Sequence, residues 1–245
     1  MKCKYEKDYI IRTSDCDHSA VMGIPQTFDL FMDMASIHAE SLGIGMRFMN
    51  ETGMFWLTAK TRVRFLKKPH ILQNVRVNTW PNKPRGVQTI RNYTITTPEG
   101  EVMAEGKTQW TVLNTKTGSL VRIDDVFPSG LDFLEDCVID EPFTRMDEDI
   151  KGLEAYETYK VRSVDIDLGG HMNNVAYVRA LFGTFSSKEL DEMKISDCEV
   201  CYKHPCYEGD ILIFYRKNKP DGTEIIVKNR EGATVILAKF RSKED

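Results

Sequence analysis

Apolar residues recur at the three- and four-residue spacing of a helix in a stretch that begins at Pro25 and ends at Gly43. The positions on this stripe are Phe28, Phe31, Met32, Ala35, Ala39 and Leu42. Proline suits the first turn of a helix, and glycine suits the position just past its end. The pattern therefore predicts one long helix.

Runs rich in Val, Thr and aromatic residues follow this helix, and turn signals such as Asn82-Lys83-Pro84 separate them. In the first half they cover 54–67, 74–80, 87–97 and 101–114. The second half predicts a shorter helix from about Asn174, then runs over 196–204, 210–217, 224–230 and 234–241. Each half thus predicts a strand, a helix and an antiparallel meander, which is an α+β unit whose sheet can wrap one buried helix.

The two halves also match in sequence, with 11–22 aligned on 161–172. Arg12, Asp15, Asp17 and Met22 recur there as Arg162, Asp165, Asp167 and Met172. A second match, of 64–77 with 200–213, pairs Pro69 with Pro205 and His70 with Cys206. The shared order predicts a tandem duplication, with an N-terminal unit over 1–125, a linker over 126–155 and a C-terminal unit over 156–245.

Composition places the chain among ordinary globular proteins, with 41% hydrophobic and 29% charged residues. A net charge of −4 does not favour a nucleic-acid partner. The amino terminus lacks the apolar core of a secretory signal, and apolar runs stay short of the roughly 18 residues of a membrane span. We therefore expect a cytoplasmic protein without a membrane partner, whose six cysteines are reduced thiols.

Candidate chemistry concentrates in the stretch DIDLGGHMNN, residues 165–174. Gly169 and Gly170 allow a tight turn into the second helix, whose N-terminal N–H groups could hold an oxyanion. One well-aimed donor to such a charge contributes about 3 to 4 kcal/mol. His171 could act as a general base near neutral pH, and Asp167 could fix its tautomer. Asn173 and Asn174 complete the set of auxiliary candidates.

A structural interpretation of the same stretch stays open, because aspartates form turns and asparagines cap helices. The first half keeps both aspartates but has Val21 where the second half has His171. The aspartates are therefore expected to be structural in part, and the chain is expected to have one active site.

The cysteines of the second half offer two further interpretations. Cys206 could be a nucleophile paired with a histidine, but we favour a buried packing role. The stretch CEVCYKHPC holds residue types that bind zinc, namely Cys198, Cys201, His204 and Cys206. Two strand residues three apart point to opposite faces, which argues against a shared ion. The sequence thus predicts neither a metal nor a cofactor.

The duplicated unit resembles the hotdog fold, an antiparallel sheet wrapped around a long central helix. The tandem pair, Thr79-Trp80, Trp110 in TQWTVLN and the spacing D-x-D-x-x-x-H-x-N-N-x-x-Y that ends at Tyr177 resemble the acyl-acyl carrier protein thioesterases of plants and bacteria. The resemblance covers about residues 4–240. It implies hydrolysis of a fatty acyl thioester on acyl carrier protein, with release of free fatty acid.

The resemblance also implies that the first half lines the acyl-chain pocket. Its candidate lining residues are Phe28, Phe31, Met32, Trp56 and Thr58, with Met46 beside them. Two positions depart from the family: Gly169 stands where the plant enzymes have Asn, and Pro205 where they have the Glu of a Glu-Cys pair. Glu199 or Glu208 could supply a carboxylate only by a different geometry, and neither is favoured. An acyl-coenzyme A thioesterase and a non-catalytic protein that binds acyl thioesters remain alternatives. Chain length and the choice between monomer and homodimer stay open.

Overall fold

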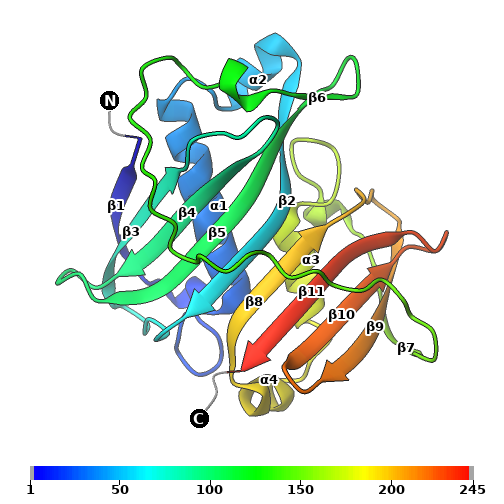
Figure 1. Ribbon diagram of the computed structural model, residues 1–245. Coiled ribbons are helices and arrows are strands. Elements are labelled where there is room, and N and C mark those ends of the chain that lie inside the picture. The colour runs from blue at the N-terminus through cyan, green and yellow to red at the C-terminus, as the bar shows by residue number, and fades with distance from the viewer. Residues whose placement is uncertain (1–2, 243–245) are drawn as a thin grey trace. The chain divides into compact units, whose positions relative to one another are not determined.

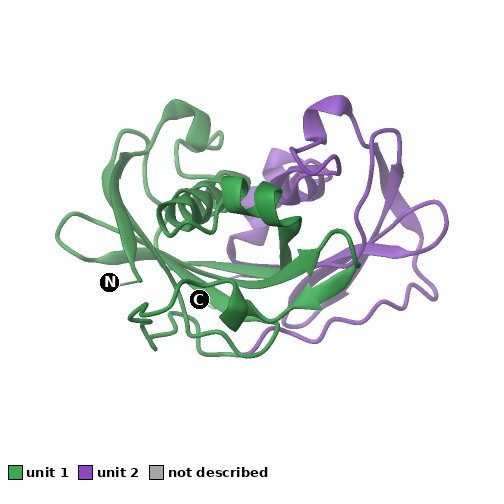
Figure 2. Ribbon diagram, turned by 90° about the horizontal axis from the view of Figure 1, so that it is seen from above, with its two compact units in different colours: residues 1–141 green, residues 142–245 purple. Residues whose placement is uncertain are grey.

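The computed structural model describes residues 3–242 and divides the chain into two compact units, 1–141 and 142–245 (Figures 1 and 2). In the first unit the elements are β1 (Tyr5–Ile10), α1 (Ile24–Ser41), α2 (Met46–Thr52), β2 (Met54–Phe65), β3 (Asn74–Pro81), β4 (Thr89–Thr96), β5 (Val102–Asn114) and β6 (Ser119–Val121). The strands form an antiparallel sheet in the order β1-β3-β4-β5-β2, and β6 pairs with β5.

Helix α1 lies along one face of this sheet, as Figure 2 shows. Its Phe31 is fully buried and stacks on Tyr93 of β4, with ring centroids 4.6 Å apart. A Cβ atom on Gly106 would come within 2.4 Å of the Phe31 ring, so glycine at this strand position lets the helix approach the sheet.

The second unit repeats this plan. Its elements are β7 (Ala155–Lys160), α3 (Asn174–Phe182), α4 (Ser187–Met193), β8 (Ile195–Tyr202), β9 (Ile211–Lys219), β10 (Gly222–Lys228) and β11 (Thr234–Ser242). The antiparallel order is β8-β11-β10-β9-β7. Phe182 of α3 packs on Phe240 of β11 at 5.0 Å between ring centroids. The predicted α+β class, with two tandem helix-and-sheet units, is confirmed.

Three short elements were not expected from the sequence: α2, α4 and β6. The two helices have seven residues each and the strand has three, so none is long enough to show a clear period. Within residues 3–242, no helix is both long and apolar enough to cross a membrane.

The hydrogen bonds confirm the first sequence match and shift the second by one residue. Asp17 N donates to Val21 O, and Asp167 N donates to His171 O. Met22 N, however, donates to Pro69 O, whereas Met172 N donates to Cys206 O. Cys206 is therefore the structural equivalent of Pro69, and the predicted equivalence of Cys206 with His70 is wrong. The Lys-x-Pro sequence found in both units suggested an alignment that differs by one residue from the one that the backbone hydrogen bonds show.

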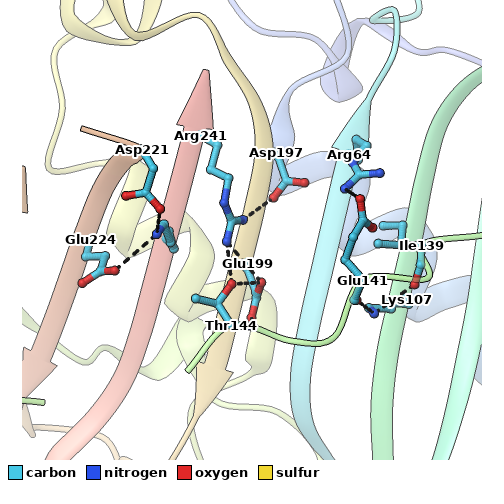
Figure 3. A network of polar contacts seen from close by, with 11 residues as sticks. Arg64, Lys107, Ile139, Glu141, Thr144, Asp197, Glu199, Asp221, Glu224 and Arg241 are labelled. Atoms are coloured by element: carbon cyan, nitrogen blue, oxygen red, sulfur yellow. Dashed lines mark hydrogen bonds and ion pairs between the residues drawn. The ribbon is translucent and has the colours of Figure 1, made fainter. Parts of the chain in front are cut away.

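The segment 133–154 forms neither helix nor strand and lies on the face of each sheet opposite its helix (Figure 1). In the first unit Trp80 Nε1 donates to Asp136 O at 3.0 Å, and Lys107 Nζ donates to Ile139 O at 3.0 Å. In the second unit Thr144 is bound by a buried glutamate of β8 (Figure 3). Polar side chains of the sheets thus hold this segment through its backbone.

Candidate active site

The loop before α3 is built on a buried carboxylate. Asp165 is 9% exposed, and its Oδ2 accepts hydrogen bonds from Tyr159 OH and Arg162 N, both at 2.8 Å. The equivalent Asp15 accepts from Tyr9 OH at 2.7 Å and from Arg12 N at 2.8 Å. The same arrangement in both units assigns this first aspartate to holding the loop.

The second aspartate closes a tight turn. Gly169 N donates to Asp167 Oδ1 at 2.7 Å, and Gly170 N donates to Asp167 O at 3.0 Å. Gly170 has a φ of 77°, in the left-handed region that favours glycine. Its counterpart in the first unit, Ala20, has a φ of 59°. The turn is therefore a property of the repeat, and glycine relieves its strain in the second unit.

The turn brings His171 next to Asp167. The Nδ1 atom of His171 lies 3.7 Å from Asp167 Oδ1, and the two side chains are 28% and 27% exposed. This separation allows a charge interaction with a protonated imidazole but exceeds hydrogen-bond length. In the first unit Asp17 has Lys68 at a similar distance, 3.8 Å, in place of a histidine. The second unit therefore replaces a fixed cation with a titratable one.

Helix α3 begins directly after this turn, with Asn173 as its N-cap. The Oδ1 atom of Asn173 accepts from Val175 N at 2.8 Å, and Asn173 N donates to Asp165 O at 2.8 Å. Asn174 is the first helical residue, and its carbonyl accepts from Tyr202 OH at 3.2 Å. The Asn173 cap thus uses one of the N–H groups expected to face an oxyanion.

Cys206 lies inside the same unit and contacts the loop through its backbone. Its N–H donates to Tyr177 OH at 2.9 Å, and its carbonyl accepts from Met172 N at 2.7 Å. The side chain is 0% exposed, and burial raises the pKa of the thiol to about 11. About one thiol in 10⁴ would be ionised at pH 7. The geometry supports packing, with Tyr177 joining α3 to the segment after β8.

If Cys206 only packs, Cys206→Ser should retain more than about a tenth of wild-type turnover, and Cys206→Ala should do no worse. Any deficit should follow the melting temperature. Turnover and thermal unfolding of both variants are the measurements. An acyl group trapped on Cys206 after a rapid quench, together with an inactive and stably folded alanine variant, would contradict this.

The two carboxylates considered as replacements for the family's glutamate differ in their surroundings. Glu199 is 0% exposed; its Oε1 accepts from Thr144 N at 2.6 Å, its Oε2 accepts from Thr144 Oγ1 at 2.9 Å, and Arg241 lies 3.8 Å away (Figure 3). Glu208 is exposed. Glu199 is therefore engaged in holding the segment 142–146 against β8.

The cysteines of the zinc interpretation do not converge. Cys198 and Cys201 both lie on β8; Cys198 is fully buried, whereas Cys201 packs against Ile226 and Leu237. Among residues 3–242, no group of His, Cys, Asp and Glu has the arrangement of a metal site.

The residues expected to line the acyl pocket lie on α1 and β2. Phe28 and Phe31 are buried at 1% and 0% exposure, Thr58 is 8% exposed, and Met32 and Trp56 are half-buried. Trp56 Nε1 donates to Ile44 O at 2.9 Å. Met46, at the start of α2, is 44% exposed.

Two exposed apolar side chains near the turn were not singled out from the sequence. Val164 and Leu168 are 85% and 89% exposed, and the equivalent residues of the first unit are the polar Ser14 and His18. The sequence does contain a signal for them: both are apolar residues in a polar loop, at positions where the first unit has polar residues. Both side chains are therefore accessible at the surface beside the turn.

Two family profiles match the chain: "Acyl-ACP thioesterase N-terminal domain" over residues 2–130 and "Acyl-ACP thioesterase C-terminal domain" over residues 150–240. The oleoyl-acyl carrier protein thioesterase 1 of Arabidopsis thaliana, a chloroplastic protein, is 22% identical over 224 residues, which cover 85% of this chain and 62% of that protein. The palmitoyl-acyl carrier protein thioesterase of Cuphea hookeriana, also chloroplastic, is 22% identical over 89% of this chain and 55% of its own length. The chain thus spans less than two thirds of these relatives.

Solved structures share the fold over nearly the whole chain. An acyl-ACP thioesterase from Bacteroides thetaiotaomicron superposes with a TM-score of 0.85 at 21% identity, covering 97% of both chains. The 12:0-ACP thioesterase of Umbellularia californica gives a TM-score of 0.82 at 19% identity, covering 98% of this chain and 96% of the other. The predicted tandem hotdog fold is confirmed.

Proposed function

The chain belongs to the acyl-ACP thioesterase family, and on this basis we propose that it hydrolyses the thioester of a fatty acyl-acyl carrier protein to release free fatty acid. The observation that carries the proposal is His171, a half-buried imidazole beside Asp167 at the start of α3, in a unit matched by the family's C-terminal profile. Release of free fatty acid from its carrier protein would make the protein a hydrolase of fatty acid biosynthesis. A cytoplasmic location stays a prediction.

In the proposed reaction His171 takes a proton from water as the oxygen attacks the thioester carbonyl carbon. The negative charge of Asp167, 3.7 Å away, stabilises the imidazolium that forms. The N-terminal end of α3 favours the developing oxyanion. When the intermediate collapses, the carbon–sulfur bond breaks, and the imidazolium returns its proton to the leaving thiolate.

We assign the acyl chain to the first unit, around Phe28, Phe31 and Thr58, and catalysis to the second. Support comes from the burial of these side chains on α1 and β2, where an apolar chain would be shielded from water. Gly169 and Pro205, which depart from the family pattern, favour the alternative of a protein that binds acyl thioesters without cleaving them. Hydrolysis assays with matched carrier-protein and coenzyme A thioesters separate these functions.

The carrier protein should dock against the exposed apolar side chains beside the turn. Leu168→Ser is expected to raise KM for an acyl-carrier thioester at least threefold and to leave KM for the matching coenzyme A thioester unchanged. Leu120→Ser, at a 51% exposed position on β6, serves as the control. Equal effects of Leu168→Ser on both substrates would contradict docking at this loop.

The duplication provides a matched pair of aspartates. Asp167→Asn should lower turnover, because it removes the charge beside His171. Asp17→Asn should change only stability, because its side chain accepts from Ser19 N and faces Lys68 instead. Turnover and thermal unfolding are measured for both variants. Equal loss of turnover would contradict a single active site in the second unit.

A further inference from the structure

A band of polar side chains crosses the helix-covered face of the first unit's sheet. Strand register places its members side by side: Thr58 and Thr61 on β2, Thr89, Arg91 and Tyr93 on β4, and Thr108 and Trp110 on β5. Apolar or small residues border the band along β5, with Ala104 and Gly106 on one side and Val112 on the other. The interior under α1 is therefore polar in its middle.

Several side chains of this band make hydrogen bonds to one another or to neighbouring groups. The hydroxyls of Thr61 and Thr108 are 3.2 Å apart, and Thr89 Oγ1 donates to Asn82 O at 2.9 Å. The guanidinium of Arg91 lies 2.9 Å from Nδ1 of the buried His38, whose pKa is lowered to about 4 by burial and by Arg91. His38 is therefore neutral at pH 7 and accepts this hydrogen bond.

Three buried polar atoms in the band make no hydrogen bond: Thr58 Oγ1, Tyr93 OH and Trp110 Nε1. Tyr93 is 0% and Thr58 8% exposed. Each buried polar group that stays unpaired lowers the stability of the folded protein. Three such groups together are more than packing alone explains, and they call for a polar group that binds them.

The three atoms belong to one neighbourhood. Thr58 and Trp110 are directly opposite each other on β2 and β5, a position in which Cβ atoms are about 4.5–5.5 Å apart. Trp110 and Thr108 lie beside the Tyr93 hydroxyl and oppose the rise in its pKa that burial causes, but neither contact has the distance and angle of a formed hydrogen bond. The other two tryptophans, by contrast, donate their indole N–H: Trp56 to Ile44 O and Trp80 to Asp136 O.

The second unit shows that the fold does not require most of this band. Its ladders place Ile195, Cys198, Ile225 and Phe240 at the positions of Thr58, Thr61, Tyr93 and Thr108. These four side chains are apolar and at most 6% exposed. Polar residues stand at the positions of Arg91 and Trp110, where the second unit has Thr223 and Ser242. The architecture is therefore stable with apolar residues at the positions of Thr58 and Tyr93, so the hydroxyls of the first unit have another role.

We propose that Thr58, Tyr93 and Trp110 bind a hydroxyl group carried on the acyl chain, so that the substrate class is a hydroxylated fatty acyl thioester. The inference rests on the proposed function, because it places the acyl chain in the first unit. An alcohol accepts from the indole N–H and both accepts from and donates to the two hydroxyls. A saturated chain would leave all three groups unpaired, and a site built for a hydroxyl discriminates strongly against such a ligand.

The test measures calorimetric binding of free acids to the whole protein, using dodecanoic acid and its isomers with one hydroxyl at successive carbons. At least one isomer should bind about tenfold or more tightly than dodecanoic acid. Tyr93→Phe and Thr58→Val should each weaken that isomer by about 5- to 100-fold and leave dodecanoic acid unchanged. Thr61→Val, which alters a hydroxyl of the band outside the trio, should keep the selectivity.

Equal or weaker binding of every hydroxy isomer would overturn the inference and assign the trio to bound water. So would equal losses for both acids in Tyr93→Phe with an unchanged melting temperature. Thioester hydrolysis is measured separately. Selective acid binding without any hydrolysis would refute only the proposed function, whereas hydrolysis without preference for hydroxylated chains would refute only this inference.

Discussion

His171→Ala is expected to lower turnover by about 10² to 10⁴ while leaving acyl binding nearly intact. The variant removes the imidazole proposed to take the water's proton, and it leaves the backbone bond from Asp167 N to the carbonyl of residue 171 in place. The loop should therefore keep its shape. Steady-state kinetics on an acyl-carrier thioester, together with binding of the product acid, measure the two effects separately.

A second histidine of the same unit provides the control for this variant. His204 follows β8 and is exposed, so His204→Ala should keep wild-type turnover. A loss below tenfold in His171→Ala would remove this imidazole from the mechanism. A parallel loss of product binding in His171→Ala would instead indicate a distorted site.

The long elements could be predicted because their patterns are strong. The apolar stripe ending at Leu42 predicted α1, which the structure places at Ile24–Ser41, and Asn174 was the predicted and observed start of α3. The strand runs were bounded by turns that the structure keeps. Register was harder, because it depends on hydrogen bonds between distant strands; a shared Lys-x-Pro therefore misplaced Cys206 by one residue.

The candidate site could be argued from the sequence only where the duplication offered a comparison. Val21 stands at the position equivalent to His171, which indicated that only the second half carries a titratable group there. Asp15 and Asp165 recur in both halves, which pointed to a role in holding the loop. The role of Glu199 could not be derived in this way. Its partner Thr144 is 55 residues away, in a segment with no periodic pattern. Long-range polar contacts of this kind leave no local signal.

Glu199→Ala should lower the free energy of unfolding by about 1–3 kcal/mol, because it leaves the partly buried N–H and hydroxyl of Thr144 without their acceptor. The carboxylate accepts both the N–H and the hydroxyl of Thr144 and lies 3.8 Å from Arg241 (Figure 3). Arg241 would keep its 2.8 Å bond to Asp197. Denaturant unfolding measures the loss, and the segment 142–146 should become more accessible to proteases.

Kinetics then separate this structural role from a catalytic one, since Glu199 was a candidate for the family's missing carboxylate. Below its melting temperature the folded Glu199→Ala protein should keep most of its turnover, and Glu199→Gln, which preserves one acceptor, should recover part of the lost stability. Glu208→Ala, at an exposed position, should change stability by less than about 0.5 kcal/mol and leave turnover unchanged. A Glu199→Gln protein that is fully stable but inactive would make this carboxylate part of the reaction. The distances argue otherwise, because both of its oxygens already accept hydrogen bonds from Thr144.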